Sequence, residues 1–155
     1  MLVEASISAD DDLWRDTDLK WKHEVGVRLR AAFAGTGELV ARGDIRGTLL
    51  QECRRCLKPV ETRFEDELTL VFVSEASIVN EDDSSYTFDP TAPTLDMSRA
   101  VREEVVLATN PYVVCDPDCL GLCATCGADL NEGPCDCTED KTDPRWAALR
   151  ELKDE

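Results

Sequence analysis

Eight cysteines are the residues of this chain whose type and spacing are most suited to chemistry. Two form a Cys-x₂-Cys pair, and six more lie within 23 residues toward the end of the sequence. Their positions are Cys53, Cys56, Cys115, Cys119, Cys123, Cys126, Cys135 and Cys137. Structural zinc takes four ligands in a tetrahedron, and a short Cys-x₂-Cys loop supplies two thiolates from one turn. The eight cysteines therefore suffice for two closed sites.

The spacing divides the cysteines into two predicted zinc sites. The run from Cys123 to Gly127 resembles a zinc-ribbon knuckle, in which the glycine lets the backbone curl so that its amides point at the sulfurs. A Cys-x-Cys pair after Gly133-Pro134 completes this site. We assign Cys123, Cys126, Cys135 and Cys137 to it, and Cys53, Cys56, Cys115 and Cys119 to the other. A pairing in which Cys115 and Cys119 exchange roles with later cysteines stays open.

Other uses of the thiols fit the pattern less well. The spacing of Cys119, Cys123 and Cys126 is also that of a radical-SAM iron–sulfur cluster, but 155 residues leave no room for the barrel of those enzymes. Thioredoxin-like chemistry needs Cys-x₂-Cys at a helix start, whereas Cys53 lies among predicted strands. A disulfide framework is disfavoured in a reducing cytosol. Catalytic zinc keeps an open position, and two four-thiolate sites leave none.

Signals of catalysis are missing from the sequence. It has no Gly-rich phosphate loop, no serine nucleophile elbow and no His-Glu-x₂-His pattern. The single histidine, His23, falls on the apolar face of a predicted strand, which favours a buried structural role. We therefore expect a protein that is not an enzyme and has no small-molecule substrate.

The formal charge of −16 excludes a protein that coats nucleic acid non-specifically, because such binding comes from phosphate neutralisation by lysine and arginine. Residues 15–63 are the exception, with eleven basic and seven acidic side chains. Cations in and near the first Cys-x₂-Cys either stabilise its thiolates or contact phosphate, and both interpretations stay open. The candidate nucleic-acid-binding residues are Arg46, Arg54, Arg55 and Lys58.

The sequence patterns around the cysteines predict strands and helices, and therefore an α+β fold. Residues 21–33 alternate between apolar and polar, which is typical of a half-buried strand, and residues 38–52 and 62–73 predict further strands. Gly43 and Gly47 suggest bulges or bends. We expect a small antiparallel β-sheet or open barrel, then a helix, a Cys-rich zinc-ribbon-like module and a short C-terminal helix.

We expect one compact unit joined by a shared metal site. Residues 1–73 form its antiparallel β region with the first Cys-x₂-Cys, residues 74–93 an acidic flexible loop, and residues 94–155 the helix, the Cys-rich module and the C-terminal helix. Asp96 caps the first helix, and the last begins at Asp143-Pro144. The apolar runs are too short to cross a membrane and no signal peptide is visible, which predicts a cytoplasmic protein with no membrane partner.

Four ordered motifs between residues 21 and 153 have the order and spacing of a known family. They are Cys53-x-Arg55-Cys56-Leu57-x-Pro59-Val60, Leu95-Asp96-Met97 with Glu103-Glu104-Val105-Val106-Leu107, Cys119-x-Gly121-Leu122-Cys123-x₂-Cys126-Gly127-x₂-Leu130-Asn131 with Cys135-x-Cys137, and Asp143-Pro144-Arg145-Trp146 with Leu149 and Leu152. Together they resemble the YceD family, whose members are called large ribosomal RNA subunit accumulation proteins. The resemblance implies a non-catalytic role in synthesis, processing or stability of large-subunit (23S) ribosomal RNA.

Three functional hypotheses follow. The leading one is a factor in ribosome biogenesis that holds two zinc ions and acts on large-subunit rRNA or a pre-ribosomal particle, directly or through a protein partner. The alternative is a zinc-stabilised protein-interaction adaptor with no RNA contact, which docks through residues 74–93 and the helix of Trp146. The third is a redox switch that uses the thiols. The salt dependence of RNA binding distinguishes the first two hypotheses, because direct phosphate contact weakens steeply as the salt concentration rises.

Overall fold

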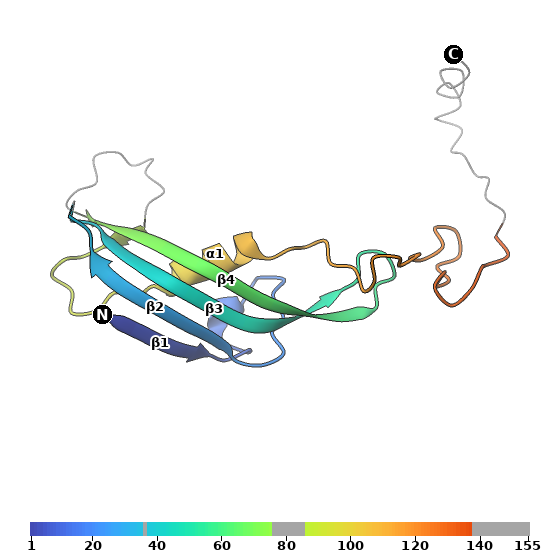
Figure 1. Cartoon of the computed structure of the whole chain (residues 1–155), viewed down its shortest axis with the longest axis horizontal. Helices are drawn as coiled ribbons and strands as arrows, with labels where there is room; N and C mark the ends of the chain where they lie inside the picture. Colours follow the sequence, from blue (N-terminus) through green and yellow to red (C-terminus); the bar gives the residue numbers. More distant parts are fainter. Residues whose placement is uncertain (36, 76–85, 138–155) are drawn as a thin grey trace, which may run out of the picture.

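Figure 1 shows the computed structural model of the chain, which describes residues 1–35, 37–75 and 86–137. These residues contain five strands, one α-helix and a short 3₁₀ turn. The elements are β1 (Leu2–Ile7), η1 (Asp12–Trp14), β2 (Val25–Phe33), β3 (Leu39–Glu52), β4 (Pro59–Ser74), β5 (Tyr86–Phe88) and α1 (Ser98–Ala108). The predicted C-terminal helix lies outside the described residues. No helix in the described ranges is long and apolar enough to cross a membrane.

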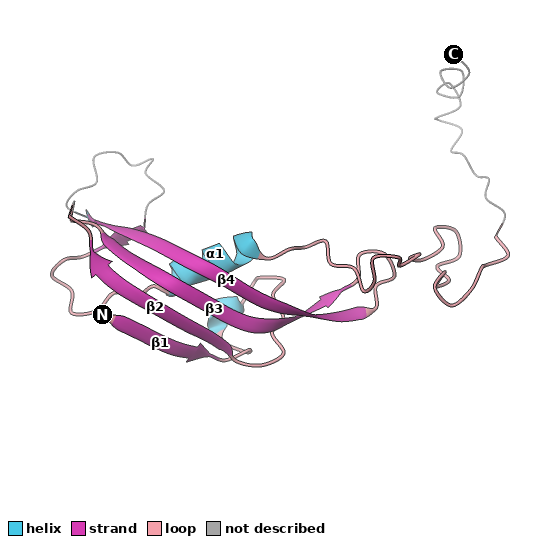
Figure 2. Ribbon diagram, in the orientation of Figure 1, coloured by secondary structure: helices cyan, strands magenta, loops and turns pink. Residues whose placement is uncertain are grey.

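The strands form one open sheet in the order β1-β2-β3-β4-β5 (Figure 2). Neighbours are antiparallel, as predicted, except that β5 runs parallel to β4. The predicted α+β class is confirmed, and the sheet is open, not a barrel. The sequence prediction missed β1, in which only Val3 and Ile7 are even half-buried, and β5, three residues long inside the segment predicted as a loop. Both strands are too short or too exposed to give a clear alternation.

One face of the sheet carries the main core. Alternate residues of β2, β3 and β4 point to this face because successive side chains of a strand lie on opposite sides. The buried residues of these three strands are Val25, Val27, Leu29, Ala31, Ala41, Ile45, Leu49, Phe64, Leu68, Leu70 and Phe72. Trp14 of η1 and Ala100, Val101 and Val105 of α1 belong to the same apolar cluster. The turn and the helix therefore cover this face and leave the other face open to solvent.

Two glycines of β3 lie on the core face, and the bulge predicted at each of them is absent. The pairing of β3 with β4 runs without interruption through Gly43 and Gly47, so neither marks a bulge. A Cβ atom at Gly43 would lie 1.9 Å from the carbonyl oxygen of Arg28 on β2, and one at Gly47 would lie 2.6 Å from the Trp21 ring. Both positions need glycine because a neighbour approaches the backbone too closely for a side chain.

His23 is exposed, which corrects the prediction of a buried histidine. The regular pairing of β2 begins at Val25 and not at Trp21, so His23 lies before the strand and outside its alternation. Trp21 itself forms an isolated bridge to Leu49 and is 5% exposed. The predicted alternation therefore holds from Val25 to Ala31, whereas Phe33, at the end of the predicted strand, is 69% exposed.

A hydrogen bond joins β5 to α1. The Tyr86 hydroxyl donates to Oε2 of Glu103 at 3.0 Å, and the same carboxylate accepts from Arg99 at 2.8 Å. Asp96 was predicted to cap this helix, but the N-cap residue is Met97, and Asp96, one residue earlier, accepts a hydrogen bond from the Ser98 amide at 2.8 Å. Burial of the phenol, followed by its bond to Glu103, raises the pKa of Tyr86 to about 12. The protonated phenol is therefore the form that the fold favours.

This raised pKa predicts a loss of stability at high pH. The contribution is fully present below the unfolded tyrosine pKa of about 10 and disappears as pH rises through about 12. In a Tyr112→Phe chain, Tyr86 is the remaining tyrosine, and its phenolate absorbance should titrate with a midpoint near that upper value. Adding Glu103→Gln should lower the midpoint. A midpoint that ignores this substitution would contradict the role given to the hydrogen bond.

β3 and β4 extend past their neighbours as a two-stranded ribbon (Figure 1). Pairing of β2 with β3 ends at Arg46, and residues 20–22 bond to β3 as far as Leu50, whereas β3 and β4 pair as far as Glu52 and Pro59. The segment after α1 runs in the same direction and meets the turn at the end of this ribbon (Figure 1). We call residues 53–58 together with residues 111–137 the tip. The predicted cysteine sites all lie in the tip.

Candidate metal centres

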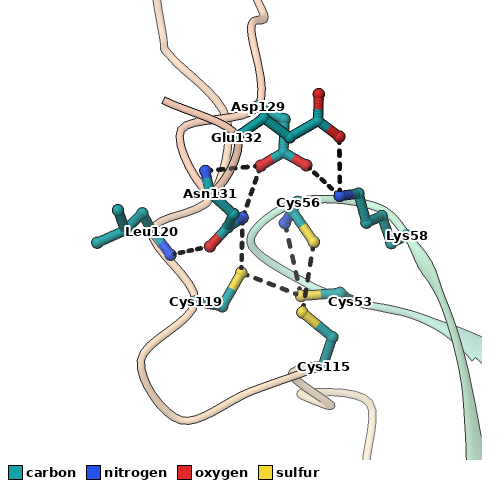
Figure 3. Close-up of polar contacts among 9 residues, drawn as sticks. All are labelled: Cys53, Cys56, Lys58, Cys115, Cys119, Leu120, Asp129, Asn131 and Glu132. Carbon is teal, nitrogen blue, oxygen red and sulfur yellow. Dashed lines mark hydrogen bonds and ion pairs between the residues drawn. The ribbon is translucent and has the colours of Figure 1, made fainter. Parts of the chain in front are cut away.

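The first cluster of sulfurs forms where the β3–β4 turn meets the segment that follows α1 (Figure 3). The turn supplies Cys53 and Cys56, and the segment supplies Cys115 and Cys119. The four Sγ atoms all lie within 4.8 Å of one another. Cys53, Cys56 and Cys119 are at most 5% exposed, whereas Cys115 is exposed. The cluster thus joins two distant parts of the chain and has one side toward solvent.

The second cluster lies entirely within the last part of the tip. It contains Cys123, Cys126, Cys135 and Cys137, whose Sγ atoms also lie within 4.8 Å of one another. Cys126 is exposed and the other three are partly exposed. The two clusters are the same two groups into which the spacing divides the cysteines. The exchange of Cys115 and Cys119 with later cysteines is not seen.

Both Cys-x₂-Cys turns have the same backbone form. In the first, the Arg55 and Cys56 amides donate to Sγ of Cys53 at 3.4 and 3.5 Å, and the Leu57 amide donates to the Cys53 carbonyl. In the second, the Thr125 amide donates to Cys123 Sγ at 3.4 Å and the Gly127 amide to the Cys123 carbonyl. Leu57 and Gly127 follow the second cysteine with φ of 60° and 74°. Leucine at this left-handed position marks a strained backbone that the surrounding contacts must hold.

Within each cluster, the surroundings lower the pKa of one cysteine and raise the pKa of another. Backbone amides, that of Cys56 first, lower the pKa of Cys53 to about 6, while contact with the Cys56 and Cys119 thiols raises the pKa of Cys115 to about 12. The second cluster repeats the pattern, because the Cys126 amide helps to lower the pKa of Cys123 to about 6 and the Cys126 thiol raises that of Cys137 to about 12. Four thiolates this close need a cation. A bound divalent ion would supply it.

The sulfur positions fit such an ion. Sγ of Cys53 lies 3.9 Å from that of Cys119, and Sγ of Cys56 lies 3.5 Å from that of Cys115. A tetrahedron with about 2.3 Å from ion to sulfur places its sulfurs about 3.8 Å apart, whereas a disulfide needs about 2.0 Å. All eight cysteines are free thiols. Each cluster could therefore hold one metal ion.

Two of the four predicted nucleic-acid-binding residues hold the tip together. The Arg55 guanidinium donates to the carbonyl oxygens of Pro117 and Cys119 at 3.0 and 2.8 Å. Lys58 pairs with Asp129 at 2.7 Å and with Glu132 at 3.2 Å. Both side chains therefore bridge the first turn to later parts of the tip.

The other two predicted residues are more exposed. Arg46, on the open face of β3, pairs with Asp44 and Glu65 at 3.1 Å each. Arg54 donates to the Pro111 carbonyl at 2.6 Å, and its guanidinium lies 5.7 Å from the centre of the Tyr112 ring. Tyr112 is 75% exposed, so this cation–aromatic pair lies at the surface.

A pair of arginines on the open face escaped the sequence prediction. Arg30 of β2 lies directly opposite Arg42 of β3, and both are exposed. Like charges in this arrangement destabilise a sheet, and neither side chain has an ion-pair partner among the described residues. The sequence contains both residues, but only the strand register reveals that they are neighbours.

Comparison with known proteins finds a family match over the part of the chain that contains the cysteine clusters. The family model described as large ribosomal RNA subunit accumulation protein YceD matches residues 41–153. This match begins within β3 and includes all eight cysteines. No solved structure matches the chain.

Curated relatives from mycobacteria are similar over most of the chain, and one from a plant over less than half of it. An uncharacterized protein of Mycobacterium tuberculosis is 34% identical over 128 residues, which cover 80% of this chain and 59% of that protein. One of Mycobacterium leprae is 28% identical over 138 residues, covering 86% and 61%. A protein of Arabidopsis thaliana named large ribosomal RNA subunit accumulation protein YCED homolog 1, chloroplastic, is 34% identical over 68 residues, covering 44% and 21%. The chain thus spans about three fifths of the length of its mycobacterial relatives.

Proposed function

This chain belongs to the YceD family, and on that premise we propose that it is a non-catalytic zinc protein that supports accumulation of large-subunit ribosomal RNA. The observation that carries the proposal is the family match over a segment that contains both four-cysteine clusters. The name of the Arabidopsis relative supports the ribosomal role. The eight free thiols suit a reducing compartment, in agreement with a cytoplasmic protein.

Zinc is the ion that best fits the donor set. Four thiolates in a tetrahedral arrangement select zinc or iron, and the two knuckle turns resemble those of zinc ribbons. Closed four-thiolate sites have no open position for water or substrate, which supports a structural role. In this proposal the two ions stabilise the tip, and the chain performs no reaction.

The exposed arginines form the proposed contact with RNA. Arg42 and Arg46 lie on one face of β3, and Arg30 faces Arg42 from β2. An RNA phosphate between Arg30 and Arg42 would relieve the repulsion between the two guanidinium groups, and arginine matches phosphate geometry well. The Arg54–Tyr112 pair adds a cation and an aromatic ring at the tip. Arg55 and Lys58 support this surface indirectly, through the contacts that hold the tip.

A salt series with paired variants tests this contact. Binding of the full chain to a large-subunit rRNA transcript should weaken as salt rises, with a slope of about 0.7 per phosphate contact on single-stranded segments. Arg30→Ala with Arg42→Ala should remove the phosphate contact between the two arginines and reduce that slope by about 0.7. Arg15→Ala with Arg99→Ala is the control, because it removes the same charge at two exposed ion pairs elsewhere. Equal slopes for the two double variants would remove the Arg30–Arg42 pair from the proposal.

A protein-interaction adaptor with no RNA contact is the second candidate. It is favoured by the finding that Arg46, Arg54, Arg55 and Lys58 all have partners within the chain. An adaptor would sediment with pre-ribosomal particles yet leave purified rRNA unshifted at every salt concentration. Depletion of the protein should lower the ratio of large- to small-subunit rRNA under either candidate. An unchanged ratio would contradict the ribosomal role itself.

A further inference from the structure

We infer that the two cysteine clusters bind their metal ions cooperatively, with Asn131 as the residue that couples them. This inference rests on the metal-binding part of the proposed function and goes beyond it. Asn131 lies on the segment that carries the second cluster, between its two pairs of ligands. Its side chain nevertheless points at a sulfur of the first cluster (Figure 3). The contacts of this segment explain how one site can sense the other.

The Asn131 side chain makes three polar contacts. Its Nδ2 atom donates to Cys119 Sγ at 3.5 Å and to Oδ1 of Asp129 at 2.6 Å, and its Oδ1 atom accepts from the Leu120 amide at 2.8 Å. The Leu120 amide can only donate, so it fixes which end of the Asn131 amide faces the sulfur. A hydrogen-bond donor from outside the ligand set orients a ligating sulfur and tunes its affinity for the metal. Asn131 thus supplies an N–H donor to Cys119 Sγ from the loop of the second cluster.

An ion pair holds the same segment from the other side. Lys58, two residues after Cys56, pairs with Asp129 and Glu132, which flank Asn131 (Figure 3). This cation, followed by the Asn131 amide, lowers the pKa of Asp129 to about 2, and the two carboxylates raise the pKa of Lys58. The side chain of Asp129 is 13% exposed, so the pair is partly shielded from water. These ion pairs therefore hold the loop of the second cluster against the turn of the first.

The backbone continues this junction. The Leu122 amide, next to Cys123, donates to the Arg55 carbonyl at 3.1 Å. Gly121 has a φ of 77°, and a Cβ atom there would lie 3.0 Å from the same carbonyl oxygen. The first turn thus contacts the second knuckle immediately before its first cysteine. An ion in the second cluster would fix this loop. Less conformational entropy would then be lost when Asn131 orders against Cys119.

Coupling between sites must be reciprocal, and it can be measured as a thermodynamic cycle. Cys135→Ser with Cys137→Ser leaves the first cluster, and Cys53→Ser with Cys56→Ser leaves the second. Zinc affinities of the full chain and of both variants follow from competition with a chromophoric chelator. We expect the two-zinc affinity of the unmodified chain to exceed the product of the two single-cluster affinities by about tenfold or more, in line with contacts outside the ligand set. Equality would overturn the coupling and leave the zinc proposal intact.

A second variant keeps all eight cysteines, because loss of Cys53 and Cys56 also removes a folding element of the tip. Asn131→Asp retains the acceptor for Leu120 but turns an oxygen toward Cys119, and should lower the two-zinc affinity about tenfold. Asn110→Asp is the matched control, since Asn110 Oδ1 also caps a turn by accepting the Tyr112 amide. We expect the control to bind zinc like the unmodified chain. Equal affinities for Asn131→Asp and Asn110→Asp would overturn the role of Asn131, and a chain that binds no zinc would overturn both proposals.

Discussion

Exhaustive chelation of zinc should unfold the tip while the five-stranded sheet stays folded. The tip has few apolar contacts of its own, because among the described residues just Val60 of β4 and Val114 and Leu122 of the tip pack on the buried cysteines. Each structural zinc site contributes about 10–16 kcal/mol of apparent binding free energy. The main core shares none of its buried residues with the cysteine cluster. Hydrogen exchange should therefore show residues 111–137 losing protection on chelation, while the amides of β2, β3 and β4 keep theirs.

The thermal unfolding of the sheet in the chelated chain is the control for this experiment. A cooperative transition should persist, since the apolar cluster beneath α1 remains, and zinc added back should restore protection in the tip. Protected amides at residues 111–137 after chelation would show that metal does not hold the tip. Loss of the sheet transition would show instead that the two apolar clusters fold as one.

Gly43→Ala should be the most damaging single substitution in the sheet. The added Cβ would lie 1.9 Å from a carbonyl oxygen and 2.9 Å from Cα of Leu29, both backbone atoms that cannot turn away. The strands β2 and β3 would have to separate locally, and overpacking of this kind costs about 3 kcal/mol or more. For a chain of this size that cost lowers Tm by roughly 6–12 °C. Thermal unfolding with zinc in excess measures it without loss of the tip.

Gly26→Ala is the matched control for this substitution. Gly26 also lies in the sheet, on β2, but the nearest atom to an added Cβ is 4.0 Å away. It has no positive φ, so alanine fits and should be neutral or stabilise the chain by about 0.4–1 kcal/mol. If Gly43→Ala melted like Gly26→Ala, the close approach of β2 to β3 would not restrict this position.

The sequence predicted what depends on short-range patterns. Ligand spacing divided the cysteines into the same two groups that the structure brings together, because each knuckle is a local turn. Alternation predicted β2, β3 and β4, since one face of each strand is buried. The bulge predicted at Gly43 and Gly47 was wrong. A β-bulge and a close neighbouring strand both favour glycine, so the sequence alone does not distinguish them. Only the register shows that Gly43 faces a backbone oxygen.

The contacts that the sequence could not predict are those between segments. Lys58 and Asp129 are separated by 71 positions, and nothing in either neighbourhood indicates the other. Arg30 and Arg42 are opposed only because β2 and β3 pair in one register. Asn131 belongs to a motif that resembles a known family, yet its contact with Cys119 depends on how the second loop docks on the first turn.

The long β3–β4 ribbon also sets a spacing. From Arg46 to Glu52 there are six residues, which at about 3.3 Å each place the cysteine turn roughly 20 Å from Arg46 along the ribbon. A paired ribbon keeps that offset far better than an unpaired linker would. A molecule that touched Arg46 and the cysteine turn at once would therefore need to span about this length.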